Sequence, residues 1–237
     1  MQSDTIYLNV LAGFANRLRA LISGICLAED LGKKLVIVWK PNWACNISIN
    51  ECFDMKTLPV SYNEIMQTEN FMKIFSYDLN MSPFMIESYG AFYKAYTPQW
   101  YGHLRKIRFL QNPIIDPSTI GIHIRRKDNK QSILHSPNEY FIEQIKKEIE
   151  NNPQAQFYLA TDCEKTKEII LANFKDRIIT QNFVLYRDTK EGMLNSLNDF
   201  VSLSLCSKIL GSYCSSYGEI AAAYGNKPLI IPSVVHS

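Results

Sequence analysis

Short apolar runs alternate with longer segments of helical periodicity along this chain, and this alternation constrains the fold more than any other feature. The first example lies near the amino terminus. An apolar run at 5–10 precedes a segment at 18–31 whose apolar residues recur at helical spacing, and a second apolar run follows at 35–39. Continuous apolar runs of this length are typical of strands covered on both faces. A strand, a helix and another strand in this order predict a parallel sheet.

The second half of the chain repeats the alternation more regularly. Strands are expected at 119–125, 156–160, 177–180, 208–211 and 228–231. The helices expected between them begin near Ser136, Thr161, Met193 and Ser215. At Ser136 and Thr161 a glutamate three residues later completes the pattern of a capping box. This half is therefore predicted to be a doubly wound nucleotide-binding domain.

A domain boundary is expected at two proline turns, Asn112-Pro113 and Asp116-Pro117. We divide the chain into domains at 1–115 and 116–237. Within the first domain, residues 40–115 contain short strand-like pieces without a clear rhythm, and aromatic residues are dense from 84 to 109. Such rings are more often core than platforms on which an acceptor sugar stacks.

Composition excludes several classes of partner. The 237 residues carry a net charge of only +2, which argues against a nucleic acid or an anionic membrane as the ligand. A small anion needs only a local cluster of cations and stays possible. None of the six cysteines forms a C-x-x-C pair, no secretory signal is seen at the start, and no apolar run approaches the ~20 residues that span a bilayer. We expect a cytoplasmic protein with reduced thiols and no membrane span.

The segment His123-Ile-Arg-Arg-Lys-Asp128 places three adjacent cations at the carboxyl end of an expected strand. Open α/β sheets bind ligands at this edge, and the fork of an arginine matches the geometry of a phosphate. Alternation along the strand places His123 and Arg125 on one face. We expect Arg125 to bind a diphosphate, with His123 beside it and Asp128 orienting an arginine. A solvated charge cluster without a ligand is the competing interpretation.

Two features further along the chain are also compatible with a nucleotide. The strand at 208–211 leads into a helix whose first turn carries Ser215 and Ser216, and helix amino termini bind phosphate. The carboxylate of Asp199, on a predicted helix, can accept both the N1–H and the amino group of guanine. Each feature has an ordinary alternative, because Ser216 and Glu219 fit a capping box and Asp199 fits an exposed helix acid.

The turn Gly13-Phe-Ala-Asn16-Arg17-Leu18 follows the first expected strand. From it, Asn16 and Arg17 can reach into a cleft between the domains, although Asn16 is also an ordinary N-cap. The sequence contains no Asp-x-Asp pair, the usual ligand of a divalent cation at a sugar-nucleotide diphosphate, so no metal site is expected. It also lacks the motifs of serine hydrolases, P-loop proteins and dinucleotide-binding proteins.

Four segments in order resemble the metal-independent fucosyltransferases, a superfamily of α1,2-, α1,6- and protein O-fucosyltransferases. They are the turn at 13–18, similar to a G-x-x-N-[RQ]-L element; the H-x-R-x-x-D segment at 123–128; Tyr158-Leu-Ala-Thr-Asp162, similar to a strand end of the α1,6 branch; and the helix, strand and loop at 199–216. The resemblance extends over most of the chain.

The resemblance implies a GT-B-like fold of two Rossmann-like domains, with an acceptor-side domain at 1–115 and a donor domain at 116–237. It implies inverting, metal-free transfer of fucose from GDP-fucose to a glycan or another hydroxyl acceptor, with no cofactor besides the GDP-sugar. The roles it implies are these: Arg125 and Arg126 at the diphosphate, His123 and Asp199 at the guanosine, Ser215 and Ser216 at phosphate, Asp162 in the donor site, and Asn16 in the cleft.

One departure from the superfamily leaves the general base open. Some relatives have a glutamate after the second arginine, whereas 129–132 contains no carboxylate here. Asp128, a residue of the first domain, or a dissociative reaction without a base are the options. Two other functions also stay open: transfer from another nucleotide sugar such as GDP-mannose, and a non-catalytic module that binds a sugar nucleotide or a glycan.

Overall fold

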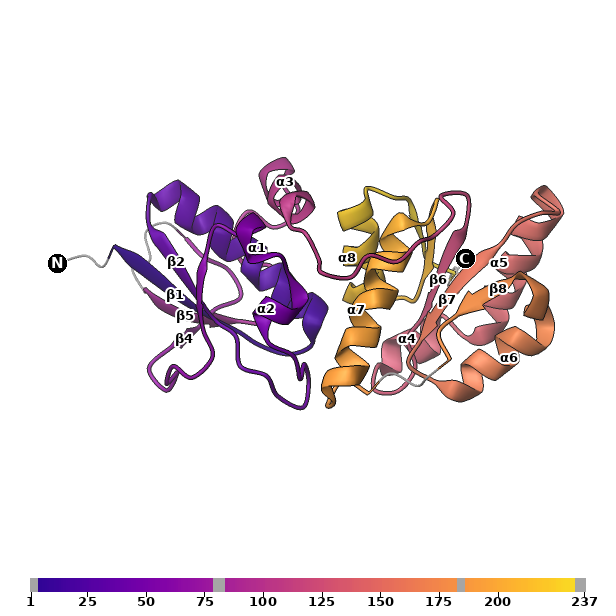
Figure 1. Cartoon of the computed structure of the whole chain (residues 1–237), viewed down its shortest axis with the longest axis horizontal. Coiled ribbons are helices and arrows are strands. Elements are labelled where there is room, and N and C mark those ends of the chain that lie inside the picture. Colours follow the sequence, from indigo (N-terminus) through magenta and orange to yellow (C-terminus); the bar gives the residue numbers. More distant parts are fainter. Residues whose placement is uncertain (1–3, 79–83, 183–185, 233–237) are drawn as a thin grey trace. The chain divides into compact units, whose positions relative to one another are not determined.

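The computed structural model of the chain describes residues 4–78, 84–182 and 186–232 (Figure 1). The chain divides into two compact units. The N-terminal unit comprises Met1–Leu110 and Arg187–Met193, and the C-terminal unit comprises Gln111–Tyr186 and Leu194–Ser237. The expected boundary between 115 and 116 thus lies a few residues after the division at 110. Residues 187–193, which we had placed in the second domain, belong to the N-terminal unit.

The return segment 187–193 is held in the N-terminal unit by long-range contacts. The backbone N–H of Asn46 donates to the carbonyl of Arg187 at 3.0 Å, and its side-chain amide donates to the carbonyl of Asp188 at 2.8 Å. Lys190 forms an ion pair with Glu51. These partners lie about 140 positions away along the chain, so local sequence patterns could not predict this membership.

The N-terminal unit is built on a five-stranded parallel sheet. Its strands are β1 (Thr5–Val10), β2 (Lys34–Val38), β3 (Ser61–Asn63), β4 (Met72–Lys73) and β5 (Met85–Ser88), in the order β3-β2-β1-β5-β4. Its helices are α1 (Phe14–Leu31), α2 (Ile49–Cys52), a 3-10 turn at Met55–Thr57 and α3 (Pro98–Lys106). The predicted β-α-β unit at the start of the chain is confirmed.

Helix α1 packs closely on this sheet. A Cβ on Gly24 would lie 2.5 Å from a methyl carbon of Leu8, so glycine allows the close approach of helix and strand. Gly32 ends the helix in the left-handed conformation that its position predicted, and its N–H donates to the carbonyl of Glu29.

The C-terminal unit contains a second five-stranded parallel sheet. Its strands are β6 (Ile120–Ile124), β7 (Phe157–Thr161), β8 (Ile178–Thr180), β9 (Ile209–Gly211) and β10 (Leu229–Ile230), in the order β10-β9-β6-β7-β8. Its helices are α4 (Lys130–His135), α5 (Asn138–Asn151), α6 (Glu164–Phe174), α7 (Lys190–Leu205) and α8 (Ser216–Gly225), with a 3-10 turn at Lys175–Arg177. The first residues of α7, up to Met193, belong to the N-terminal unit. All five predicted strands are present.

Helices cover both faces of this sheet, as expected of a doubly wound domain (Figure 1). Ile122 and Ile124 pack with Phe141 of α5 in a buried cluster on one face. On the other face, Gly121 lies against Leu203 of α7 and His123 lies against α8. The alternation along β6 thus gives one strand two different surroundings.

Both capping boxes predicted in this half are wrong. Helix α5 begins at Asn138 with Pro137 as N-cap, and the hydroxyl of Ser136 instead accepts a hydrogen bond from the backbone N–H of Tyr213. Thr161 is the last residue of β7, and its hydroxyl donates to the carbonyl of Ile124 at 2.8 Å. In each case the side chain bonds to a backbone group from a distant part of the chain and does not cap the helix. Helix α4 was not predicted.

No helix of the parts that the structure describes is long and apolar enough to cross a membrane.

Candidate functional site

The strand order of the C-terminal sheet reverses beside β6. From β6 the chain moves through β7 to β8 on one side, and it then returns through α7 to β9 and β10 on the other. In open α/β sheets, ligands bind at the carboxyl ends of the strands next to such a switch point. The candidate site is therefore formed by the loop after β6, residues 125–129, and the loop after β9, residues 212–215.

Ser212 joins these two loops at the strand ends. Its hydroxyl accepts a hydrogen bond from the backbone N–H of Arg125 at 2.9 Å and donates to the carbonyl of His123 at 3.3 Å. Sequence analysis did not select this serine. Its position directly after β9 was the available signal, because the carboxyl ends of neighbouring parallel strands meet at one edge.

Three more hydrogen bonds connect the loops further from the strands. The side-chain amide of Asn129 donates to the carbonyl of Cys214 at 2.9 Å, while its oxygen caps α4. The hydroxyl of Ser132 donates to the carbonyl of Tyr213 at 2.6 Å, and Ser136 accepts from the N–H of Tyr213 at 3.0 Å. The short helix α4 thus serves to hold one loop against the other.

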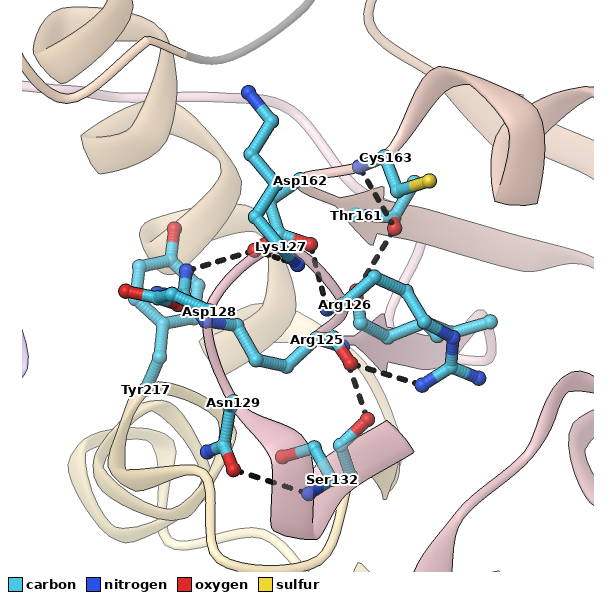
Figure 2. A network of polar contacts seen from close by, with 12 residues as sticks. Arg125, Arg126, Lys127, Asp128, Asn129, Ser132, Thr161, Asp162, Cys163 and Tyr217 are labelled. Atoms are coloured by element: carbon cyan, nitrogen blue, oxygen red, sulfur yellow. Dashed lines mark hydrogen bonds and ion pairs between the residues drawn. The ribbon is translucent and has the colours of Figure 1, made fainter. Parts of the chain in front are cut away.

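Arg125 occupies the carboxyl end of β6, where it was predicted (Figure 2). Its guanidinium forms ion pairs with Asp128 and, at 3.0 Å, with Asp162. The side chain is 25% exposed, and that of Asp128 is 46% exposed. Arg125 is therefore held by two carboxylates at a partly open position, and one of them is Asp128, the residue expected to orient an arginine.

Asp162 organises the loop after β6. Its carboxylate accepts hydrogen bonds from the backbone N–H groups of Arg126 at 2.7 Å and Lys127 at 3.3 Å, in addition to its ion pair with Arg125 (Figure 2). The structure places Asp162 beside Arg125, and its membership of the donor site stays a prediction. Its contacts, however, are those of a residue that positions the loop.

Arg126 differs from the expectation that it binds the diphosphate. Its guanidinium donates to the carbonyls of Arg125 at 2.8 Å and Ser136 at 2.9 Å and to the side chain of Asn138, and it lies 5.9 Å from the ring centroid of Phe141. Burial lowers its pKa. Figure 2 shows the side chains of Arg125 and Arg126 pointing to opposite sides of the loop. Arg126 is a structural residue because its donors are satisfied within the protein.

The three adjacent cations therefore do not compete for one anion. Arg125 pairs with carboxylates, Arg126 is turned into the protein, and the ammonium of Lys127 lies 4.5 Å from the ring centroid of Tyr186. Successive side chains of this loop leave it in different directions and have different partners.

His123 is buried under α8, with 5% of its surface exposed. Its ring lies 4.9 Å from the ring of Tyr217, and a Cβ on Gly218 would approach its Nδ1 to 2.9 Å. Burial, with the nearby charges of Arg125 and Arg126, lowers its pKa to about 3. His123 is therefore neutral at physiological pH, and its buried Nδ1 has no hydrogen-bond partner among the residues that the structure describes.

Asp199 is buried, so the alternative of an exposed helix acid is wrong. Its Oδ1 accepts hydrogen bonds from the hydroxyl of Tyr158 at 2.7 Å and from the side-chain amide of Gln181. Burial raises its pKa to about 6. Sequence analysis missed Gln181, which follows β8 directly and so lies at the same edge of the sheet as the loops after β6 and β9.

Ser215 and Ser216 begin α8, next to the loop after β9. Ser215 is the N-cap, and its side chain makes no capping hydrogen bond; both serines are half-buried. The alternative capping box between Ser216 and Glu219 is wrong, because Ser216 already lies inside the helix. The N–H groups of the first turn of α8 thus lie at the switch point, as a phosphate site requires.

The two site residues predicted in the N-terminal unit, Asn16 and Arg17, differ in their burial. Asn16 is half-buried, and its side-chain oxygen accepts from Arg19 at 3.3 Å; Gly13, not Asn16, is the N-cap of α1. Arg17 is completely buried, which corrects the expectation that it reaches into a cleft. It donates to the carbonyls of Ala12 at 2.9 Å and Lys40 at 2.8 Å, and burial lowers its pKa.

No metal cluster is evident in the described ranges: no three His, Cys, Asp or Glu side chains there are grouped so that they could hold an ion.

No protein-family model matches the chain, and no curated protein matches its sequence. Solved structures do match its fold. The α-1,6-fucosyltransferase NodZ soaked with GDP-fucose is 15% identical, with a TM-score of 0.66 over 96% of this chain and 94% of that one. The fucosyltransferase NodZ from Bradyrhizobium is 14% identical, with a TM-score of 0.63 over 92% of this chain and 93% of the other.

POFUT1 in complex with GDP is 9% identical, with a TM-score of 0.57 over 96% of this chain and 97% of that one. At identities this low, the likeness establishes the fold. The expected GT-B-like architecture of two Rossmann-like parallel sheets is thereby confirmed, and the four segments that suggested it belong to a chain with the fold of these fucosyltransferases.

Proposed function

We propose that this protein is a glycosyltransferase that moves fucose from GDP-fucose to a hydroxyl acceptor. The observation that carries the proposal is Arg125, a partly exposed arginine held by two carboxylates at the switch point of a doubly wound parallel sheet. Structures of the same fold were obtained with GDP or GDP-fucose, which supports the same donor here.

The proposed donor site uses the edge formed by the loops after β6 and β9. Arg125 exchanges its ion pair with the more exposed Asp128 for the donor diphosphate, while Asp162 keeps the loop in place. Ser215, Ser216 and the N–H groups of the first turn of α8 complete the phosphate contacts. Arg126 contributes by fixing the loop.

For the nucleoside we propose His123 and Asp199. Neutral His123 offers an uncharged ring to the guanosine. The two hydrogen bonds that Asp199 accepts are both at Oδ1, and we assign the guanine base to its other oxygen. A carboxylate that accepts two donors from the base selects guanine over adenine.

In the reaction, the acceptor oxygen forms a bond to C1 of fucose as the bond from C1 to the phosphate oxygen breaks. The bonding electrons leave with GDP, and the hydroxyl proton is released. Attack from the face opposite the leaving group inverts the configuration at C1. Arg125 and the helix N–H groups stabilise charge that develops on the diphosphate, and such a preorganised group contributes on the order of 10²–10³ in rate.

We propose that this charge stabilisation makes the reaction independent of metal, since Arg125 supplies a cation at the diphosphate. Before the donor binds, the ion pair with Asp128 orients Arg125; when the diphosphate replaces that pair, the carboxylate of Asp128 is released. The general base therefore stays open between Asp128, a residue of the N-terminal unit and a reaction without a base. The cytoplasmic location stays a prediction.

The first test is calorimetric titration with GDP, UDP and ADP in EDTA. Binding of GDP with weak binding of the other two supports the donor site. A failure of GDP to bind would remove the basis of the proposal. GDP binding without transfer or hydrolysis of GDP-fucose under any acceptor would identify a non-catalytic module, and a strict need for Mg²⁺ or Mn²⁺ would contradict the metal-free mechanism.

A further inference from the structure

Three aromatic rings in the segment 71–101 of the N-terminal unit are exposed, although other rings of this segment are core. Phe75 is 61% exposed, Tyr89 42% and Tyr96 37%. By contrast, Phe92, Tyr93 and Trp100 are buried. The structure thus separates the aromatic-rich part of the chain into core rings and a small exposed set. We call Phe75 and Tyr89 the aromatic ledge.

The ledge lies where a ligand of this sheet is expected. Tyr89 directly follows β5, and Phe75 comes two residues after β4. From β1 the chain continues through β2 to β3 on one side, whereas β5 and β4 lie on the other, so the strand order reverses between β1 and β5. The ledge is therefore at the carboxyl edge of the N-terminal sheet, beside its own switch point.

Side-chain contacts give the ledge a defined shape. The rings of Phe75 and Tyr89 meet edge to face, with centroids 5.2 Å apart and planes at 74°. The ammonium of Lys73 lies 5.6 Å from the ring centroid of Tyr89. A pair held in this way presents apolar surface in a fixed orientation, with a hydrogen-bond donor beside it.

A second cation lies next to the ledge. The Nη2 of Arg19 is 3.7 Å from the position that a Cβ of Gly90 would occupy, and Gly90 follows Tyr89 directly. The same guanidinium lies 5.9 Å from the ring centroid of Tyr96 and donates to Asn16. Aromatic surface, two cations and an amide therefore form a continuous strip made from four segments of the chain.

A pyranose ring matches this strip. One face of such a ring is made of C–H groups that pack on an aromatic ring, while its hydroxyls lie around the rim and accept hydrogen bonds from ammonium and guanidinium groups. We propose that the aromatic ledge binds a pyranose ring of the acceptor glycan, with Lys73 and Arg19 donating to its hydroxyls. This inference rests on the proposed glycosyl transfer for the identity of the ligand.

The test is saturation-transfer NMR of the full chain with methyl β-galactoside, methyl β-glucoside and methyl N-acetyl-β-glucosaminide as probes. We compare wild type with the double variant Phe75→Ala, Tyr89→Ala. The matched control is Tyr62→Ala, because Tyr62 is 41% exposed on β3 at the opposite edge of the same sheet. Since all three rings are largely exposed, these variants are expected to fold.

We expect saturation transfer to at least one probe in wild type and Tyr62→Ala, and a roughly tenfold loss in the double variant, because the ring surface that covers the sugar is gone. Tyr89→Phe keeps the ring and should retain most of the signal. Equal signals in wild type and the double variant, or no signal in wild type, would overturn the proposal.

Calorimetry with GDP separates this inference from the proposed function. The double variant should bind GDP as wild type does, because the ledge belongs to the other unit. If GDP fails to bind while the ledge still binds a sugar, the proposed glycosyl transfer is contradicted and the ledge is supported as a glycan site. If GDP binds and the ledge variants leave the saturation signal and the acceptor KM unchanged, the proposal that the ledge binds a sugar is wrong and the proposed donor site is supported.

Discussion

The two sheets of this protein share most of their strand order, yet the arginines that follow their central strands differ in burial and in their partners. β1 and β6 are both central, each begins a β-α-β unit, and each leads into a loop at a switch point. Arg17 follows β1 and is completely buried, where it donates to two backbone carbonyls. Arg125 follows β6, is partly exposed and pairs with two carboxylates.

This difference shows that the partner of an arginine decides its role. The carbonyls of Ala12 and Lys40 belong to the backbone and cannot move away, so Arg17 ties the loop after β1 to the end of β2. Asp128 is a partly exposed side chain that can rotate away when a phosphate arrives. Arg17 is therefore expected to support the fold, and Arg125 to bind the ligand.

The largest effect expected is that of Arg125→Ala on transfer. The rate should fall by a factor on the order of 10²–10³ or more, because a preorganised charge at the leaving group is lost. Stability should change little, since the partners of this partly exposed side chain in the described part of the chain are the carboxylates of Asp128 and Asp162. Transfer assays and urea unfolding check both statements. Arg177→Ala is the control for transfer: Arg177 lies at the opposite end of the same sheet and donates to two backbone carbonyls, so its loss should lower stability and leave transfer by the folded protein unchanged. Activity of Arg125→Ala near that of wild type would refute the diphosphate site.

Arg17→Ala should show the reverse pattern. We expect a loss of about 3 kcal/mol in the free energy of unfolding, because two backbone carbonyls lose their donor and removal of a completely buried side chain opens a cavity. The affinity of the remaining folded protein for GDP should not change. Arg17→Lys should recover only part of the stability, because an ammonium lacks the planar fork. A variant as stable as wild type would show that the two arginines do not differ in this way.

The raised pKa of Asp199 makes the free energy of unfolding depend on pH. Because its pKa is raised from 3.8 to about 6 in the folded protein, the folded state binds the proton more tightly than the unfolded chain. Its contribution is present below pH 3.8 and is lost as the pH rises to about 6, by about 2–3 kcal/mol.

Urea unfolding of wild type and Asp199→Asn across this range isolates the contribution of Asp199. The difference is needed because His123, whose pKa is lowered from 6.5 to about 3, contributes stability that is lost as the pH falls through the same range. Asparagine still accepts hydrogen bonds from Tyr158 and Gln181 but does not titrate. Identical pH profiles for the two proteins would contradict the buried position of Asp199.

The smallest effects concern the return segment 187–193. The ion pair of Lys190 with Glu51 is exposed, so Lys190→Ala should change the free energy of unfolding by at most about 0.5 kcal/mol. Asn46→Ala should cost about 1 kcal/mol, because its side chain donates to the carbonyl of Asp188. Hydrogen exchange at 187–193 should accelerate in Asn46→Ala and not in Lys190→Ala. Equal exchange rates in both variants would show that contacts other than these two hold the segment in the N-terminal unit.

The sequence by itself determined the class of fold. Strands buried on both faces and helices with one apolar stripe are local properties of composition and spacing, which is why the five strands of the second sheet and the first β-α-β unit could be predicted. It also located Arg125 at a strand end, because the run of cations follows an apolar run directly. The strands between 40 and 115 were harder to predict from the sequence, since β3 and β4 have only three and two residues.

Only the tertiary structure decided which polar side chains are available to a ligand. Ser136 and Thr161 fit local capping boxes but bond to distant backbone groups, and Arg126 fits a phosphate site but is satisfied within the protein. The same applies to Arg17. A hydrogen bond depends on a partner that the fold brings from far along the chain, whereas burial of an apolar run depends on its own residues. The sequence therefore predicted the frame of the site, and the contacts across the sheet edge selected its members.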